Sequence, residues 1–207
     1  MPKRHIPITP SILYFGTPVV LLVTCNEDGS ANITPISSAW ALGQHVILGL
    51  GAMGRGTANL LRTGECTLNF PSADLWSNVE RIARTTGLSP VPEDKAAAGY
   101  IHCGDKFALS GLTRQASMAV RAPRIIECPL QMEARLLSSH RCAADGDLEP
   151  PPHFIVEVGV LKTYAHNDIV IAGTDHIAPS RWKPLFYVFR HYFGHAVDLG
   201  SNFRSEV

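Results

Sequence analysis

The stretch "VILGLGAMGRGTANLLRTGE", residues 46–65, decides which fold this chain of 207 residues adopts. A short apolar run leads into Gly49–Gly54, which spells G-x-G-x-x-G, and a helix-like segment follows from Thr57 to Arg62. Strand, glycine turn and helix come in this order in the dinucleotide-binding half of a Rossmann fold. The flanking sequence has to show whether strands and helices go on alternating.

The segments before the glycine motif predict consecutive antiparallel strands. Residues 19–25 are apolar and β-branched, residues 26–30 have turn chemistry, and residues 31–37 return to an extended pattern. A second turn at Gly43-Gln44 leads into a strand at His45–Leu50. The glycine motif therefore comes third in a run of hairpin-linked strands, whereas a Rossmann half would open the chain with it.

The segments after the motif do not sustain the alternation of strand and helix either. We expect a strand in residues 64–70, a helix in residues 74–87 with Asp74 as N-cap and Gly87 as its end, and a strand in residues 124–139 with Pro129 at an edge or bulge. Residues 153–173 read as another hairpin with its turn at residues 166–168. A Rossmann site would use Asp74 as its acidic residue, but a helix cap already explains Asp74. The sequence favours a mainly β fold.

The glycine turn keeps a chemical meaning without the Rossmann fold. A strand that turns through glycines into a helix presents unpaired backbone N–H groups and the positive end of the helix dipole. Arg55 and Thr57 add a guanidinium and a hydroxyl at the same place. We therefore predict an anion site, most naturally for a phosphate. The alternative is a surface turn with a solvated arginine.

Composition limits the classes of function. Lys plus Arg equals Asp plus Glu at 18 each, so no overall field favours nucleic acid or an anionic membrane. The apolar run Val19–Val23 is too short to span a bilayer, and no signal-peptide core of ~7 to 15 apolar residues follows the basic start. We expect a cytoplasmic protein with one domain over residues 1–207, whose aromatic C-terminal tail, residues 179–207, packs on the body.

Cysteine and histidine patterns do not indicate a metal site. The five cysteines are widely spaced without a C-x-x-C pair, which predicts reduced, mostly buried thiols. His191 and His195 stand four residues apart as in zinc hydrolases, but Tyr192 occupies the place of the catalytic glutamate. No G-x-S-x-G elbow marks a serine nucleophile. Adjacent strand residues point to opposite faces, so His102 and Cys103 do not form a catalytic pair.

Three segments carry a resemblance to a known family. Residues 17–51 contain N-x-T-P-x-S-S, residues 55–74 contain R-x-T-x-N-L and L-N-F-P, and residues 99–113 read "GYIHCGDKFALSGLT". Together they resemble the flavin reductase-like, FMN-binding split-barrel proteins. The likeness runs from about Thr17 to Arg135 and, more weakly, through residues 175–194. It implies an antiparallel split β-barrel with a few flanking helices, a homodimer, and noncovalent FMN near the subunit interface.

The resemblance also implies site residues. The strand Thr34–Trp40 would lie along the isoalloxazine, Leu50 and Gly51 would let the backbone approach the ribityl chain, and Arg55 with Thr57 would bind the phosphate. His102 would belong to the active-site loop as the catalytic residue. The full set of expected cofactor-binding residues is Thr34, Pro35, Ser37, Ser38, Ala39, Trp40, Leu50, Gly51, Arg55, Thr57, Asn59 and Asn69.

Two functions from different classes follow from this resemblance. The first is an NAD(P)H-dependent FMN oxidoreductase, which passes a hydride from NAD(P)H to FMN and on to flavin or another small acceptor. The second is a non-catalytic split barrel that carries FMN or haem as a carrier or sensor. If Gly49–Gly54 holds the FMN phosphate, NAD(P)H has no second G-x-G-x-x-G and must reach the flavin from an open side.

Overall fold

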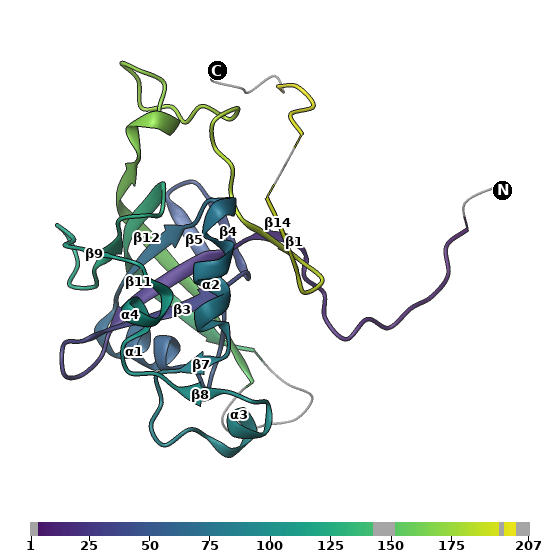
Figure 1. The fold of residues 1–207 in the computed structure, drawn as a ribbon, viewed down its shortest axis with the longest axis vertical. Helices are drawn as coiled ribbons and strands as arrows, with labels where there is room; N and C mark the ends of the chain where they lie inside the picture. Colours follow the sequence, from purple (N-terminus) through teal and green to yellow (C-terminus); the bar gives the residue numbers. More distant parts are fainter. Residues whose placement is uncertain (1–3, 143–151, 195–196, 202–207) are drawn as a thin grey trace.

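The computed structural model describes residues 4–142, 152–194 and 197–201. Its centre is a seven-stranded antiparallel sheet with the strand order β3-β2-β6-β11-β12-β5-β4 (Figure 1). The strands are β2 (Val20–Cys25), β3 (Ala31–Ile36), β4 (Ala39–Leu42), β5 (His45–Gly51), β6 (Glu65–Phe70), β11 (Leu130–Arg141) and β12 (His153–Ala165). The mainly antiparallel β fold predicted from the sequence is confirmed.

Smaller elements surround this sheet. A three-stranded sheet joins β1 (Phe15–Pro18) to β13 (Phe186–Val188) and β14 (His191–Phe193), so residues from both ends of the chain pair with each other. The remaining strands are the antiparallel pair β9 (Arg114–Gln115) and β10 (Arg124–Ile125), and the parallel pair β7 (Thr85–Thr86) and β8 (Ile101–His102). The helices are α1 (Arg55–Thr63), α2 (Trp76–Ala83), α3 (Glu93–Ala97) and α4 (Lys106–Ser110), with the 3-10 turns η1 (Ala73–Leu75) and η2 (Asn167–Ile169).

Strand β2 is buried on both faces because it separates two hydrophobic cores. Val20 and Leu22 point into one core with strand residues of β5, β6 and β12, whereas Leu21 and Val23 point into the other. Alternate side chains of a strand face opposite sides of its sheet, so a strand covered on both sides has to be apolar throughout. The second core is completed by α2 and α4, which contribute Ile82 and Phe107.

Two predicted element boundaries are wrong. The helix expected over residues 74–87 starts as the 3-10 turn η1 and becomes α2 only at Trp76. Asp74 lies inside η1 and does not cap the helix, and Gly87 lies beyond β7. Strand β7 takes up the backbone at Thr85 by pairing with β8, and this contact between distant segments ends the helix early.

The hairpin predicted over residues 153–173 is also wrong. Strand β12 ends at Ala165, and η2 follows where the hairpin turn was expected. Val170 then bridges to Ile177 instead of pairing back along β12. β11 pairs with β12 from Phe154 to Ala165, whereas β5 covers the other edge only from His153 to Gly159, and the chain leaves β12 through η2 without pairing back.

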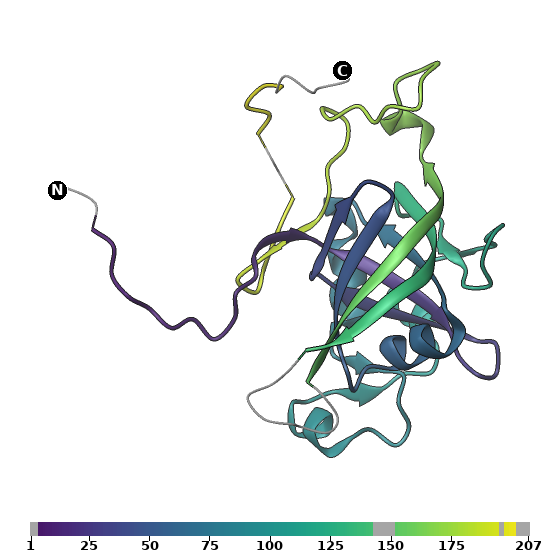
Figure 2. The same cartoon turned by 180° about the vertical axis from the view of Figure 1, so that it is seen from behind.

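Part of the C-terminal tail packs on the body, whereas residues 197–201 are exposed. Phe186–Phe193 forms the hairpin β13–β14, which pairs with β1, while the N-terminal segment from Arg4 extends away from the sheet in both views (Figures 1 and 2). The five cysteines are free thiols, of which Cys66 and Cys128 are buried and the others half-buried. Within the described ranges, none of the helices combines the length and the apolar character that a membrane span needs.

Candidate functional site

A cavity of about 940 Å³ lies between the start of α1, the end of β3, the segment around β7, and the C-terminal hairpin. Its volume is at the upper end of the ~300–1,000 Å³ that small-molecule sites typically have. Segments from both ends of the sequence meet here, since Tyr14 and Tyr187 line the same cavity as Gly51 and Arg55. The fold therefore assembles a site for a ligand of nucleotide size.

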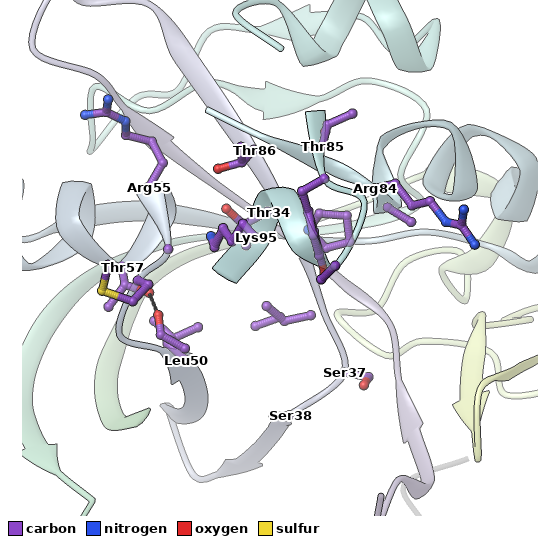
Figure 3. A pocket seen from close by; sticks show the side chains of 18 of the residues that line it. Thr34, Ser37, Ser38, Leu50, Arg55, Thr57, Arg84, Thr85, Thr86 and Lys95 are labelled. Carbon is purple, nitrogen blue, oxygen red and sulfur yellow. Dashed lines mark hydrogen bonds between the residues drawn. The ribbon is translucent and has the colours of Figure 1, made fainter. Parts of the chain in front are cut away.

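The glycine motif forms the turn from β5 into α1 at one wall of this cavity. Gly54 N donates to Gly51 O over 3.1 Å, and the Thr57 hydroxyl donates to the same carbonyl over 2.8 Å (Figure 3). The first N–H groups of α1, from Arg55 onward, have no acceptor within the helix. A Cβ on Gly51 would meet no atom within 4 Å, so the backbone is open to the cavity at this position. The predicted anion site has the backbone that it requires.

Two glycines of the motif are needed for close packing. A Cβ on Gly56 would overlap Thr34 Oγ1 and lie 3.1 Å from Thr34 Cβ, and a Cβ on Gly49 would lie 2.9 Å from Ser38 Cβ. Gly49 N also donates to Ser38 O over 2.7 Å. The glycines thus let α1 and β5 approach the segment of Thr34 and Ser38, which forms the base of the cavity.

Arg55 connects the helix wall to the segment after β7. Its Nε donates to Gly87 O over 3.2 Å, and the absence of a side chain at Gly87 leaves room for it, because a Cβ there would lie 3.1 Å from Arg55 Cγ. Only one of the five guanidinium N–H groups is used in this bond. The other donors are available to an anion at the start of α1. Arg84 lies across the cavity from Arg55 (Figure 3).

Lys106 lies at the floor of the cavity and was not predicted. Its side chain is 4% exposed, and its Nζ donates to Ile33 O over 2.9 Å and to Thr85 O over 3.4 Å. Burial lowers the pKa of this ammonium group to about 8. The lysine connects β3 to β7 and places a positive charge beside the cavity. Its position in "GDKF", within a segment that carries the family resemblance, was a signal that could have identified it.

The wall opposite α1 is aromatic. The ring centroids of Tyr14 and Tyr187 are 5.5 Å apart, and those of Tyr187 and Tyr192 are also 5.5 Å apart. The Tyr192 hydroxyl donates to Glu80 Oε2 over 3.1 Å, which connects the hairpin to α2. Burial, with the Glu80 carboxylate as a second cause, raises the pKa of Tyr192 far above its ordinary value. The wall therefore combines aromatic rings with the charged side chains of Glu80 and Arg190.

Most of the predicted cofactor-binding residues come together in this cavity. Its lining includes eight of them: Thr34, Pro35, Ser37, Ser38, Leu50, Gly51, Arg55 and Thr57. The expected continuous strand over residues 34–40 is interrupted, because β3 ends at Ile36 and β4 begins at Ala39. Ser37 and Ser38 form this break and line the cavity, and Ser38 O accepts from Gly49 N of β5.

Five predicted site residues lie outside the cavity lining. Past the break, Ala39 enters the hydrophobic core and Trp40 is exposed on the sheet. Asn59 donates to Thr24 Oγ1 and Asn26 Oδ1, and so connects α1 to β2 and the turn that follows it. Asn69 is buried and donates to Leu21 O. The amides of Asn59 and Asn69 are therefore used in hydrogen bonds that hold the fold.

His102 is the fifth of these residues. It is exposed on β8, and its Nδ1 lies 3.1 Å from Leu88 O. Lys106 on α4, rather than His102 on β8, lines the cavity. Among the residues that the structure describes, no group of three His, Cys, Asp or Glu side chains is placed to hold a metal ion. His195 lies outside the described residues, so the His191/His195 pair is not seen.

The residues present fit a flavin mononucleotide. Phosphate suits the open N–H groups of α1 with Arg55, and a planar ring suits the broken strand at Ser37-Ser38 and the wide cavity next to it. The mainly antiparallel sheet with this cavity at the start of α1 defines a flavin-related oxidoreductase domain of the split-barrel class.

Comparison with known proteins gives the family. The model of the flavin reductase like domain matches residues 12–196, so the chain belongs to that family. The chain is 42% identical over 205 residues to the uncharacterized protein YdfE from Bacillus subtilis (strain 168), a match that covers 99% of this chain and 96% of YdfE.

Solved structures show the same fold at low sequence identity. Flavoredoxin of Desulfovibrio vulgaris (Miyazaki F) superposes with a TM-score of 0.74 at 18% identity, covering 99% of both chains. Nitrilotriacetate monooxygenase component B from Bacillus cereus also gives 0.74, at 15% identity, covering 93% of this chain and 90% of that chain.

Proposed function

We propose that this protein is an NAD(P)H-dependent oxidoreductase that works through noncovalently bound FMN. One observation carries the proposal: a single cavity is lined by the open turn from β5 into α1, by Arg55, and by the backbone break at Ser37-Ser38. The first two suit a phosphate and the third suits the polar edge of a flavin ring. The family to which the chain belongs supports a flavin as the ligand.

Each part of the site has a separate task in this proposal. Arg55 and the N–H groups at the start of α1 bind the phosphate, and Thr57 holds the turn by its bond to Gly51 O. Ser37 and Ser38 present hydroxyl and backbone groups to the ring. Lys106 fixes the floor and stabilises negative charge above it. His102 lies on β8 outside the cavity lining and has no task in this proposal.

Bound FMN would supply the two-electron chemistry that side chains lack. The chain needs no strong acid or base for hydride transfer, and its contribution is orientation and charge. The FMN phosphate occupies the turn into α1 in this proposal. The sequence has no second G-x-G-x-x-G that could bind the pyrophosphate of NAD(P)H. We therefore expect NAD(P)H to bind loosely from the open side of the cavity.

The test is to titrate the purified protein with FMN, FAD and riboflavin, and then to follow oxidation of NADH and NADPH. We expect tight FMN binding, weaker riboflavin binding, and turnover with at least one of the two donors. FMN binding without oxidation of either donor would favour the second candidate, a flavin carrier or sensor. Failure to bind FMN would contradict both.

A homodimer is part of the proposal. Trp40 and Leu42 on β4, and Ile155 on β12, are exposed apolar side chains, and a second copy of the chain would cover such a surface. Light scattering at micromolar concentration should give twice the mass of 22.5 kDa that the single chain has. A monomer under these conditions would refute the dimer.

A further inference from the structure

The turn between β13 and β14 has an unusual backbone. Val188 pairs with His191, so Phe189 and Arg190 are the two central residues of a tight hairpin turn. Both have positive φ, 42° for Phe189 and 70° for Arg190. A two-residue hairpin of this kind prefers Asn and Gly at these positions, because other residues are strained there. Strain of this kind is often found where a side chain is held for function.

The strained turn places Arg190 at the cavity. Arg190 lines the cavity together with Tyr14, Tyr187 and Tyr192, on the wall opposite the glycine turn. Phe189 N donates to Tyr14 O over 2.7 Å, and the Tyr192 hydroxyl is bonded to Glu80, so the hairpin is held from both sides. The turn that carries Arg190 is therefore held by one backbone and one side-chain hydrogen bond.

The guanidinium of Arg190 has no partner in the part of the chain that the structure describes. Over the described ranges, it has no hydrogen bond or ion pair with another residue, although its charge acts on Tyr187. Arg55 differs, because it is bonded to Gly87 O and lies next to α1. Arg190 is thus one of several cations that line the cavity, and it lies on the β13–β14 hairpin beside tilted and edge-on tyrosine rings, on a different element from the α1 turn that suits the flavin phosphate.

We propose that Arg190 and the tyrosines beside it form a subsite for the second substrate, a planar aromatic molecule that carries an anionic group. The inference rests on the proposed function, since the flavin site defines which substrate is the second. Tyrosine faces suit a flat ring, and a guanidinium suits a carboxylate or phosphate. The same chemistry occurs in a nicotinamide dinucleotide donor and in an aromatic carboxylate acceptor, so the experiment has one arm for each.

The experiment compares wild type with Arg190→Gln, Arg190→Lys and the control Lys183→Gln, an exposed cation of the same tail that does not line the cavity. FMN affinity is measured first by fluorescence quenching. In the donor arm, anaerobic FMN-loaded protein is reduced with increasing NADH or NADPH. In the acceptor arm, the reduced protein is reoxidised with 4-nitrobenzoate and with nitrobenzene, which lacks the anion.

We expect Arg190→Gln to raise the half-saturating concentration of NAD(P)H or of 4-nitrobenzoate by about tenfold, the size of one lost charge-assisted contact. Arg190→Lys should restore part of this loss. FMN affinity, the response to nitrobenzene and the Lys183→Gln protein should be unchanged. Equal saturation of wild type and Arg190→Gln in both arms would overturn the subsite, and so would a parallel loss of FMN affinity. Absence of FMN binding by wild type would overturn the proposed function and the subsite with it.

Discussion

The two turns at the cavity contrast in a way that their sequences do not reveal. The turn from β5 into α1 contains four glycines between residues 49 and 56, and none of them has positive φ. The turn between β13 and β14 has two consecutive residues with positive φ, and neither is a glycine. At the first wall, glycine thus allows neighbouring segments to pack closely. At the second wall, the backbone is left-handed at residues that are not glycine.

The difference teaches how each wall is held. At the glycine wall, Gly56 has no side chain, and this lets α1 pack directly against Thr34. At the hairpin wall, pairing with β1 and the tyrosine contacts compensate for strain. Substitutions that add atoms should therefore damage the first wall, and substitutions that remove strain should stabilise the second.

The largest expected effect concerns Lys106, on the floor that both walls share. Its pKa is lowered to about 8 by burial, so between pH 8 and its ordinary value of 10.5 the unfolded chain binds a proton that the folded chain has lost. The free energy of unfolding therefore rises with pH in this window, by about 3 kcal/mol. Urea unfolding across this range should show the rise in wild type relative to Lys106→Met. Parallel pH profiles of the two proteins would contradict the prediction.

The next effect tests the glycine wall as an anion site. Arg55→Ala should lower FMN affinity about ten- to a hundredfold, because a charge-assisted contact is worth ~1.5 to 3 kcal/mol. Thr57→Ala should cost less, about 1 kcal/mol, because it removes the neutral hydrogen bond to Gly51 O that holds the turn. Fluorescence titration measures both. Riboflavin lacks the phosphate, and its affinity should not change; an equal loss for riboflavin and FMN would place the phosphate elsewhere.

Close packing at the same wall is tested by a pair of alanine substitutions. Gly56→Ala should reduce the free energy of unfolding by about 1 to 3 kcal/mol, since the new methyl group overlaps Thr34. Gly51→Ala is the matched control, because its methyl group would meet no atom within 4 Å. It should leave stability unchanged while reducing FMN affinity. Equal stability of the two variants would show that α1 can move away from β3.

The smallest effect concerns the hairpin wall. The double substitution Phe189→Asn with Arg190→Gly supplies the residues that this turn prefers and should raise the melting temperature, with a gain of about 1 kcal/mol. The same protein should respond to the second substrate as Arg190→Gln does. A lower melting temperature would show that the turn is not strained, and the contrast between the two walls would then be lost.

The sequence by itself determined the fold class and the glycine wall. Turn residues and apolar β-branched runs act locally, so the order of hairpins up to Leu50 could be predicted from neighbouring residues. The turn from β5 into α1 could be predicted for the same reason, because the N–H groups at a helix start follow from the backbone alone, whereas the phosphate at this turn stays a prediction. A buried strand such as β2 could also be predicted from the sequence, because every position in it is apolar or small.

Only the tertiary structure decided which side chains meet in the cavity. Asn59 and Asn69 are polar residues in matching motifs, yet their amides bond to β2 and its following turn, and their neighbours along the chain carry no sign of this. Lys106 reaches Ile33 O across 73 positions, and Arg190 reaches the cavity only because β13 pairs with β1. Such contacts depend on which distant segments pack together, and this is a property of the whole chain that no local pattern encodes.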